Sequence, residues 1–170
     1  MKISITDDGS GITRKFAQAI GATVKGRFIY IPESKGSGYI TGFAWGSDLR
    51  MMIRNYHLKE DVLIERTNEL TEGQDDVIFL VSGVFPSQVQ PEKQLLPEQA
   101  SVMICKHAVS SIIAMPSNTI FGSVTIAASR QYLRLLFSQI KHPIIESILE
   151  AKDNFVFETG ISPEMIRTAS

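Results

Sequence analysis

The chain has 170 residues, of which 44% are hydrophobic, so it is long enough to bury the core of one domain. Seventeen basic and eighteen acidic side chains give a formal net charge of −1, and neither sign forms a block, so the sequence offers no basic stripe for a nucleic-acid backbone. The single cysteine, Cys105, excludes an internal disulfide, and the sequence shows neither an apolar leader nor a run of about 20 apolar residues, so we expect a cytoplasmic protein.

The first half of the chain predicts one short helix followed by strands. Residues 13–22 space their apolar side chains for one face of a helix, and Gly21 is a natural stop. Segments rich in aromatic and β-branched residues, bounded by Gly, Pro or charged residues, then predict strands at 28–31, 39–45, 49–54 and 62–66. In the strand at 49–54, the residues of one face are all apolar, whereas the other face carries Arg50 and Arg54. We therefore expect this strand to be half exposed.

The second half continues with strands and ends in helices. Residues 77–85 are apolar at both alternating sets of positions, which predicts a strand buried on both faces. Three prolines and four glutamines make 86–99 a predicted loop, long enough to act as a lid. Further strands are predicted at 101–109, 112–115 and 120–127.

Two helices are predicted after these strands. Ser129 can cap the first, and Pro143 suits the first turn of the second. Strands followed by helices predict an α+β chain that is mainly β, and short strands separated by turns fit a sandwich or a barrel closed on itself. Ser162-Pro163-Glu164 is a further helix start, from which we expect the parent sequence to continue past Ser170.

Residues that could perform catalysis or hold a metal do not form a recognisable set. His57, His107 and His142 lie far apart, and no spacing typical of a metal site links them. Cys105 and His107 fall on one face of a predicted strand, but nothing near them in sequence supplies an orienting acid or an oxyanion hole. The sequence therefore predicts no catalytic residue, no metal ligand and no cofactor.

Apolar and aromatic residues on the predicted strands are better candidates for a site. Their inner faces could line the interior of a small barrel, which either fills with side chains or leaves room for one ligand. The alternative for each residue is an ordinary place in the core, and the sequence leaves both open. The candidate ligand-binding residues are Tyr30, Tyr39, Trp45, Met51, Phe79, Met103 and Cys105.

Four stretches of the chain carry a resemblance to a known family: KFAQAIGA at 15–22, YIPE at 30–33, GSGYITGF at 36–43 and LRMMIRNYHLKED at 49–61. They are similar to the N-terminal region of AraC-type (AraC/XylS) bacterial transcriptional regulators. The similarity continues, more loosely, through MPSNT at 115–119 to ISPEM at 161–165.

The resemblance implies a cupin-like double-stranded β-helix, or jelly-roll barrel, that senses a small-molecule effector. It assigns this barrel, with its short N-terminal helix, to 1–128 and the start of a helical dimerisation region to 129–170. The family binds DNA through a later pair of helix-turn-helix motifs, which these 170 residues do not contain. We therefore expect a homodimer that contacts DNA only through that missing region. Effectors differ among members, so the resemblance assigns no ligand residues.

Two other functions remain open from the sequence. A metal-dependent cupin enzyme, such as an isomerase or dioxygenase, would need its three histidines to converge on one ion. A structural module would pair subunits without binding any ligand.

Overall fold

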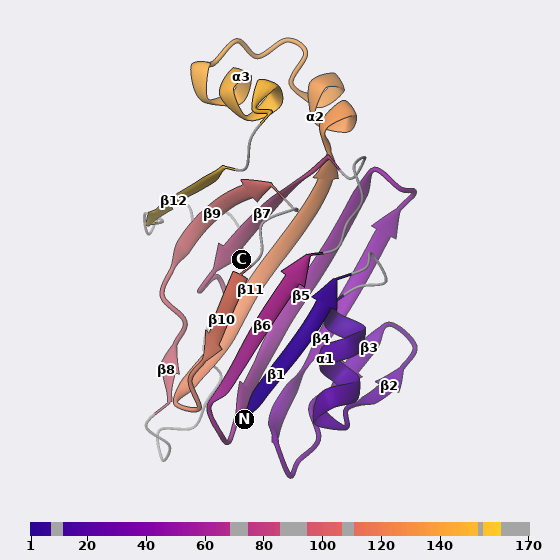
Figure 1. Cartoon of the computed structure of the whole chain (residues 1–170), viewed down its shortest axis with the longest axis vertical. Coiled ribbons are helices and arrows are strands. Elements are labelled where there is room, and N and C mark those ends of the chain that lie inside the picture. Colours follow the sequence, from indigo (N-terminus) through magenta and orange to yellow (C-terminus); the bar gives the residue numbers. More distant parts are fainter. Residues whose placement is uncertain (8–11, 69–74, 86–94, 107–110, 153–154, 161–170) are drawn as a thin grey trace.

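The computed structural model describes residues 1–7, 12–68, 75–85, 95–106, 111–152 and 155–160. Within these residues the chain is mainly β, with two sheets and three helices (Figure 1). The expected α+β composition, with helices after most of the strands, is therefore confirmed. The predicted helix start at Ser162 lies outside the described residues.

The larger sheet has the strand order β12-β9-β7-β11-β5-β4-β3-β2, and its neighbours along this path are antiparallel. A two-residue strand, β8, lies parallel to β11. The strands are β2 (Thr23–Lys25), β3 (Phe28–Tyr30), β4 (Gly36–Trp45), β5 (Leu49–Leu58), β7 (Asp76–Ser82), β8 (Leu96–Pro97), β9 (Ser101–Lys106), β11 (Thr119–Ser129) and β12 (Val156–Gly160).

The smaller sheet consists of β1 (Lys2–Asp7), β6 (Val62–Asn68) and β10 (Ser111–Met115), with β6 in the middle. β1 runs parallel to β6 and β10 runs antiparallel to it. This sheet lies over one face of the larger sheet, and helix α1 (Ile12–Ile20) continues the same layer beside β1 (Figure 1). Among the described residues neither sheet closes on itself, because β2 and β12 stand at opposite edges of the larger one.

The main core fills the space between these two layers. α1 buries Phe16, Ala17 and Ile20, the face that its sequence spacing predicts. Burying apolar side chains of this size contributes about 1.5 to 3 kcal/mol each, which makes the contact between the layers the principal source of stability. Its buried members are Ile3, Ile5, Phe16, Ile20, Ile31, Ile40, Tyr56, Leu58, Val62, Ile64, Met115 and Phe121.

A second, smaller core joins the larger sheet to the remaining helices, α2 (Arg130–Leu136) and α3 (Pro143–Glu150). α2 follows β11 directly, so both helices lie beyond one end of the sheet (Figure 1). The Ser129 side chain caps α2 by accepting a hydrogen bond from the Tyr132 amide, as predicted. Val77, Ala128, Leu133 and Ile148 form the buried centre of this core.

The structure departs from the sequence predictions at five strands. β1, β2 and β12 were not predicted, and β12 places a strand of the larger sheet inside the segment expected to be helical. β7 is shorter than the predicted strand and is mostly half-buried, with only Val77 and Ser82 buried, because neither of its faces is fully covered. Of the predicted loop at 86–99, residues 86–94 lie outside the described part of the chain, and β8 occupies two of the others.

Candidate functional site

The strand register divides the larger sheet into two faces. Residues directly opposite one another on neighbouring strands project from the same side of a sheet. Ile40, Tyr56 and Phe121 belong to the core between the layers, so their side faces the smaller sheet and is called the inner face. Leu49, Ala128 and Val77 share the other side and belong to the core beneath α2 and α3, so this side is called the outer face.

Five of the seven candidate ligand residues lie on the outer face and two on the inner face. The two inner residues are Met103 and Cys105, which lie opposite Leu80 and Ile78 on β7. The register therefore does not bring all seven to one interior. The five residues on the outer face are Tyr30, Tyr39, Trp45, Met51 and Phe79.

Aromatic rings gather on the outer face at the β3–β4 hairpin. Phe28 stacks on Tyr30 with ring centroids 5.8 Å apart and meets the Tyr39 ring edge-on at 5.4 Å. Phe43 stacks on Trp45 at 6.0 Å. Tyr30 and Trp45 are 41% and 53% exposed, so these rings form a surface rather than the lining of an enclosed cavity.

On the inner face a group of polar side chains interrupts the core. The Arg54 Nε donates to the Ser123 Oγ over 2.8 Å, and the Tyr56 hydroxyl donates to the Met115 Sδ over 3.5 Å. A Glu98 carboxylate oxygen accepts from the Gly122 amide at 3.2 Å. Burial raises the pKa of the Tyr56 hydroxyl, and the nearby Arg54 charge opposes this rise. Tyr56 therefore stays a neutral hydrogen-bond donor at physiological pH.

Cys105 does not have the surroundings of an activated thiol. It is half-buried, and burial raises the pKa of its thiol, although the Arg66 charge acts in the opposite direction. A nucleophilic cysteine needs a lowered pKa. The structure thus gives Cys105 the character of a packed side chain.

The histidines of the described chain are far from one another. His57 lies at the end of β5 near Ser37, whereas His142 accepts a hydrogen bond from the Ile144 amide and caps α3 beyond the other end of the sheet (Figure 1). His107 lies outside the described residues. Among the residues that are described, no three His, Cys, Asp or Glu side chains come together in a group able to hold a metal ion.

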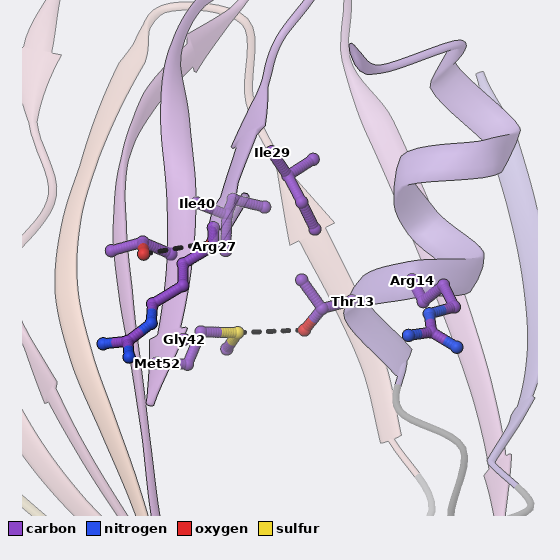
Figure 2. A pocket seen from close by; sticks show the side chains of 8 residues that line it. Thr13, Arg14, Arg27, Ile29, Ile40, Gly42 and Met52 are labelled. Carbon is purple, nitrogen blue, oxygen red and sulfur yellow. Dashed lines mark hydrogen bonds between the residues drawn. The ribbon is translucent and has the colours of Figure 1, made fainter. Parts of the chain in front are cut away.

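A pocket of about 270 Å³ lies between α1 and strands β3, β4 and β5 (Figure 2). The Thr13 hydroxyl crosses from α1 to the sheet, where it donates to the Met52 Sδ over 2.9 Å. The Thr41 hydroxyl donates to the Arg27 carbonyl oxygen over 3.1 Å. The lining residues are Thr13, Arg14, Arg27, Ile29, Ile40, Thr41, Gly42 and Met52.

The sequence predictions missed this pocket, since none of its lining residues is among the seven candidates. Its apolar floor belongs to the inner face, through Ile29, Ile40 and Met52. Both Arg14 and Arg27 are exposed at its edges. The sequence carried no distinctive signal for it, because Arg14 and Arg27 stand beside Lys15 and Lys25 and have the pattern of ordinary surface charges. Only the folded chain shows that α1 and the β3–β5 strands meet.

The two C-terminal helices and the turn between them expose aliphatic side chains that nothing in the described chain covers. Leu135 is 71% exposed, and three further residues are more than half exposed: Leu136, Ile140 and Ile144.

None of the helices among the described residues has the length and apolar character needed to cross a membrane. Comparison of the chain with family models, curated proteins and solved structures finds no match in any of the three.

Proposed function

We propose that this chain is the effector-sensing and dimerisation region of an AraC-type transcriptional regulator. In this proposal the two facing sheets belong to a cupin-like jelly roll, and DNA is bound by a separate helix-turn-helix region of the parent protein. The sequence resemblance at 15–61 supports the family, and the open arrangement of a sheet layer joined to a helical pair supports the division into sensor and dimerisation parts.

The exposed aliphatic surface of α2 and α3 is the observation that carries the proposal. Four large side chains, Leu135, Leu136, Ile140 and Ile144, are more than half exposed within ten residues of one another. Isolated apolar residues are common on protein surfaces, but several exposed aliphatic side chains along one short segment favour an interaction site. A second copy of the same helical pair would cover it with a surface of matching chemistry, as two-fold dimers do.

The helical pair is also connected firmly to the sheet, which sensing requires. Ser129 joins β11 to α2, and its hydroxyl donates to the Asp48 carboxylate over 2.7 Å at the turn between β4 and β5. Ligand binding on the sheet can change the pairing of the helices only if the two arrangements differ in their affinity for the ligand. The direct link from β11 to α2 at Ser129 gives the sheet a path by which a ligand-dependent change would reach the helices.

Light scattering tests the dimer directly. We expect the wild-type chain to dimerise, and Leu136→Glu with Ile144→Glu to weaken the dimer at least about tenfold, because charged groups would be buried in an apolar contact. Ile112→Glu is the matched control, since Ile112 on β10 is 70% exposed but lies away from the helices. A wild-type chain that stays monomeric at high concentration, or a control that dissociates equally, would contradict the proposed interface.

A further inference from the structure

We infer that the dimer contact extends from the helices onto the outer face of the larger sheet, where a second copy of the chain covers the aromatic rings of β3 and β4. These rings are called the aromatic surface. The inference rests on the proposed function for the existence of the dimer, and it adds the part of the sheet that takes part in the contact. The members of the aromatic surface are Phe28, Tyr30, Tyr39, Phe43 and Trp45.

The strand register places Trp45 next to the part of the outer face that the helices cover. Trp45 pairs with Leu49 on β5, and Leu49 pairs with Ala128 on β11, so the three side chains form one row across the sheet. Ala128 is buried beneath the helices and Leu49 packs against the same core, whereas Trp45 is exposed. Because neighbouring strands lie about 5 Å apart, roughly 10 Å separate the covered Ala128 from the uncovered Trp45.

The turn between β4 and β5 holds this end of the aromatic surface beside α2. The Ser129 hydroxyl and the Ser129 amide, at the start of α2, donate to the Asp48 carboxylate and the Asp48 carbonyl oxygen over 2.7 and 2.8 Å. This turn and α2 lie at the same end of the larger sheet (Figure 1). A second copy that sits on the helical pair is therefore brought next to Trp45.

The exposed aliphatic side chains of the helical pair are too small a surface to form a stable dimer alone. A standard interface buries about 800 Å² on each partner, of which about 450 Å² is apolar. Burying one whole aliphatic side chain removes roughly 60 to 120 Å² of apolar surface from water. The four aliphatic side chains are between 52% and 71% exposed, so they contribute about 150 to 280 Å².

The aromatic surface supplies the remaining area. An aromatic side chain can bury roughly 150 to 250 Å². Phe28, Tyr30 and Trp45 are 38%, 41% and 53% exposed, so together they add about 200 to 330 Å². The helical and aromatic parts then reach about 350 to 600 Å², which includes the apolar area of a standard interface.

The chemistry of the aromatic surface is that of the centre of an interface. Aromatic residues and arginine are enriched there, whereas lysine and acidic residues are depleted. The Arg27 guanidinium carbon lies 5.4 Å from the centre of the Phe43 ring, a cation–π contact. Stacking between neighbouring rings holds these side chains in place before a partner arrives, so association costs less side-chain entropy. A second copy presents the same two surfaces, so one two-fold contact covers both.

The single tryptophan of the chain gives the test a specific signal. Because Trp45 is the only tryptophan, its fluorescence reports on the aromatic surface alone. We expect its emission to shift to shorter wavelength, and its quenching by acrylamide to fall, as the concentration of the 170-residue chain rises through the dimer dissociation constant. Sedimentation equilibrium measures that constant independently. In Leu136→Glu with Ile144→Glu the same spectral change should need at least about tenfold higher concentration.

A substitution on the sheet tests the contact without changing the helices. Tyr30→Ser should raise the dimer dissociation constant about tenfold, because it removes an aromatic side chain from the contact. Ile112→Ser is the matched control, since Ile112 on β10 is a large exposed side chain of the other sheet, and it should leave the dimer unchanged. Urea unfolding of both variants establishes that each is folded before its dissociation constant is compared.

A Trp45 spectrum that stays the same while sedimentation shows dimer formation would overturn the inference and leave the proposed helical dimer standing. Equal effects of Tyr30→Ser and Ile112→Ser would overturn it too. Concentration-dependent shielding of Trp45 that is equally strong in the helical double variant would contradict the helical contact and support the contact through the sheet. A chain that never dimerises would contradict both.

Discussion

Arg130 lies at the junction between the larger sheet and the helical pair, with 5% of its surface exposed. Its guanidinium Nη1 donates to two carbonyl oxygens at the end of α3, those of Leu149 at 3.1 Å and Ala151 at 2.6 Å. Its Nε lies 2.8 Å from an Asp75 carboxylate oxygen just before β7. Because Asp75 is half exposed to water, the contacts to the half-buried end of α3 carry most of the stabilising effect.

Replacing Arg130 should therefore destabilise the chain more than the loss of a surface charge. We expect Arg130→Met to lower the free energy of unfolding by about 3 kcal/mol, because it leaves the Ala151 carbonyl oxygen without its donor and removes the closer of the two cations beside Asp75. Arg134→Met is the control, since this exposed side chain donates only to the Leu149 oxygen. Urea unfolding compares them, and equal losses would show that Arg130 has no special role at the junction.

Tyr56 gives the stability of the chain a dependence on alkaline pH. Burial raises the pKa of its hydroxyl above the value of about 10 that it has when unfolded. A raised pKa means that the unfolded state loses its proton first, so the stabilising contribution is complete below pH 10 and is lost as the pH rises through the folded-state pKa.

The unfolding free energy of the wild-type chain should thus fall more steeply between about pH 9 and 11 than that of Tyr56→Phe. Urea unfolding across this pH range measures both slopes. Tyr30→Phe serves as the control because its ring is 41% exposed on the outer face. If Tyr56→Phe and the wild-type chain have the same slope, Tyr56 is not buried as the structure describes.

At the scale of elements, local signals in the sequence predicted the helices well. Ser129 caps α2, Pro143 opens α3, and the apolar spacing of α1 gives its buried face. These features are local, so they can be read without knowing the fold. β1 carried an available signal, because Ile3 and Ile5 alternate with polar residues and both are buried. β12 carried almost none, since all its residues are exposed at an edge and only pairing with β9 defines it.

The cap at Ser129 offers a direct test of how α2 begins. Ser129→Ala removes the acceptor for the Tyr132 amide and the donor to Asp48, so it should lower the free energy of unfolding by about 1 kcal/mol. Ser129→Thr keeps a hydroxyl at the same place and should recover most of this loss. Circular dichroism during urea unfolding measures both variants. If Ser129→Ala and Ser129→Thr lose the same free energy of unfolding, the loss comes from the packing of β11 and not from the cap.

At the scale of the whole molecule, the sequence could not assign side chains to the two faces of the larger sheet. Both faces are apolar: Ile40 and Met52 point to the inner layer, whereas Phe43 and Met51 occupy the outer one. Alternation predicts that successive side chains of a strand project from opposite faces of the sheet, but only the position of the smaller sheet decides which face is covered. For this reason the seven candidate residues divide between the faces, and the pocket beside α1, which joins distant segments, was not predicted.

The central claim at this scale is that the exposed aliphatic side chains of α2, α3 and the turn between them pair two copies of the chain. Sedimentation equilibrium of the wild-type chain, compared with Leu136→Glu/Ile144→Glu, tests this claim most directly. We predict a monomer–dimer equilibrium for the wild-type chain and a dimer dissociation constant at least about tenfold higher for the double variant, with Ile112→Glu unchanged. A wild-type chain that stays monomeric, or a double variant that dimerises as tightly as the wild type, would contradict the claim.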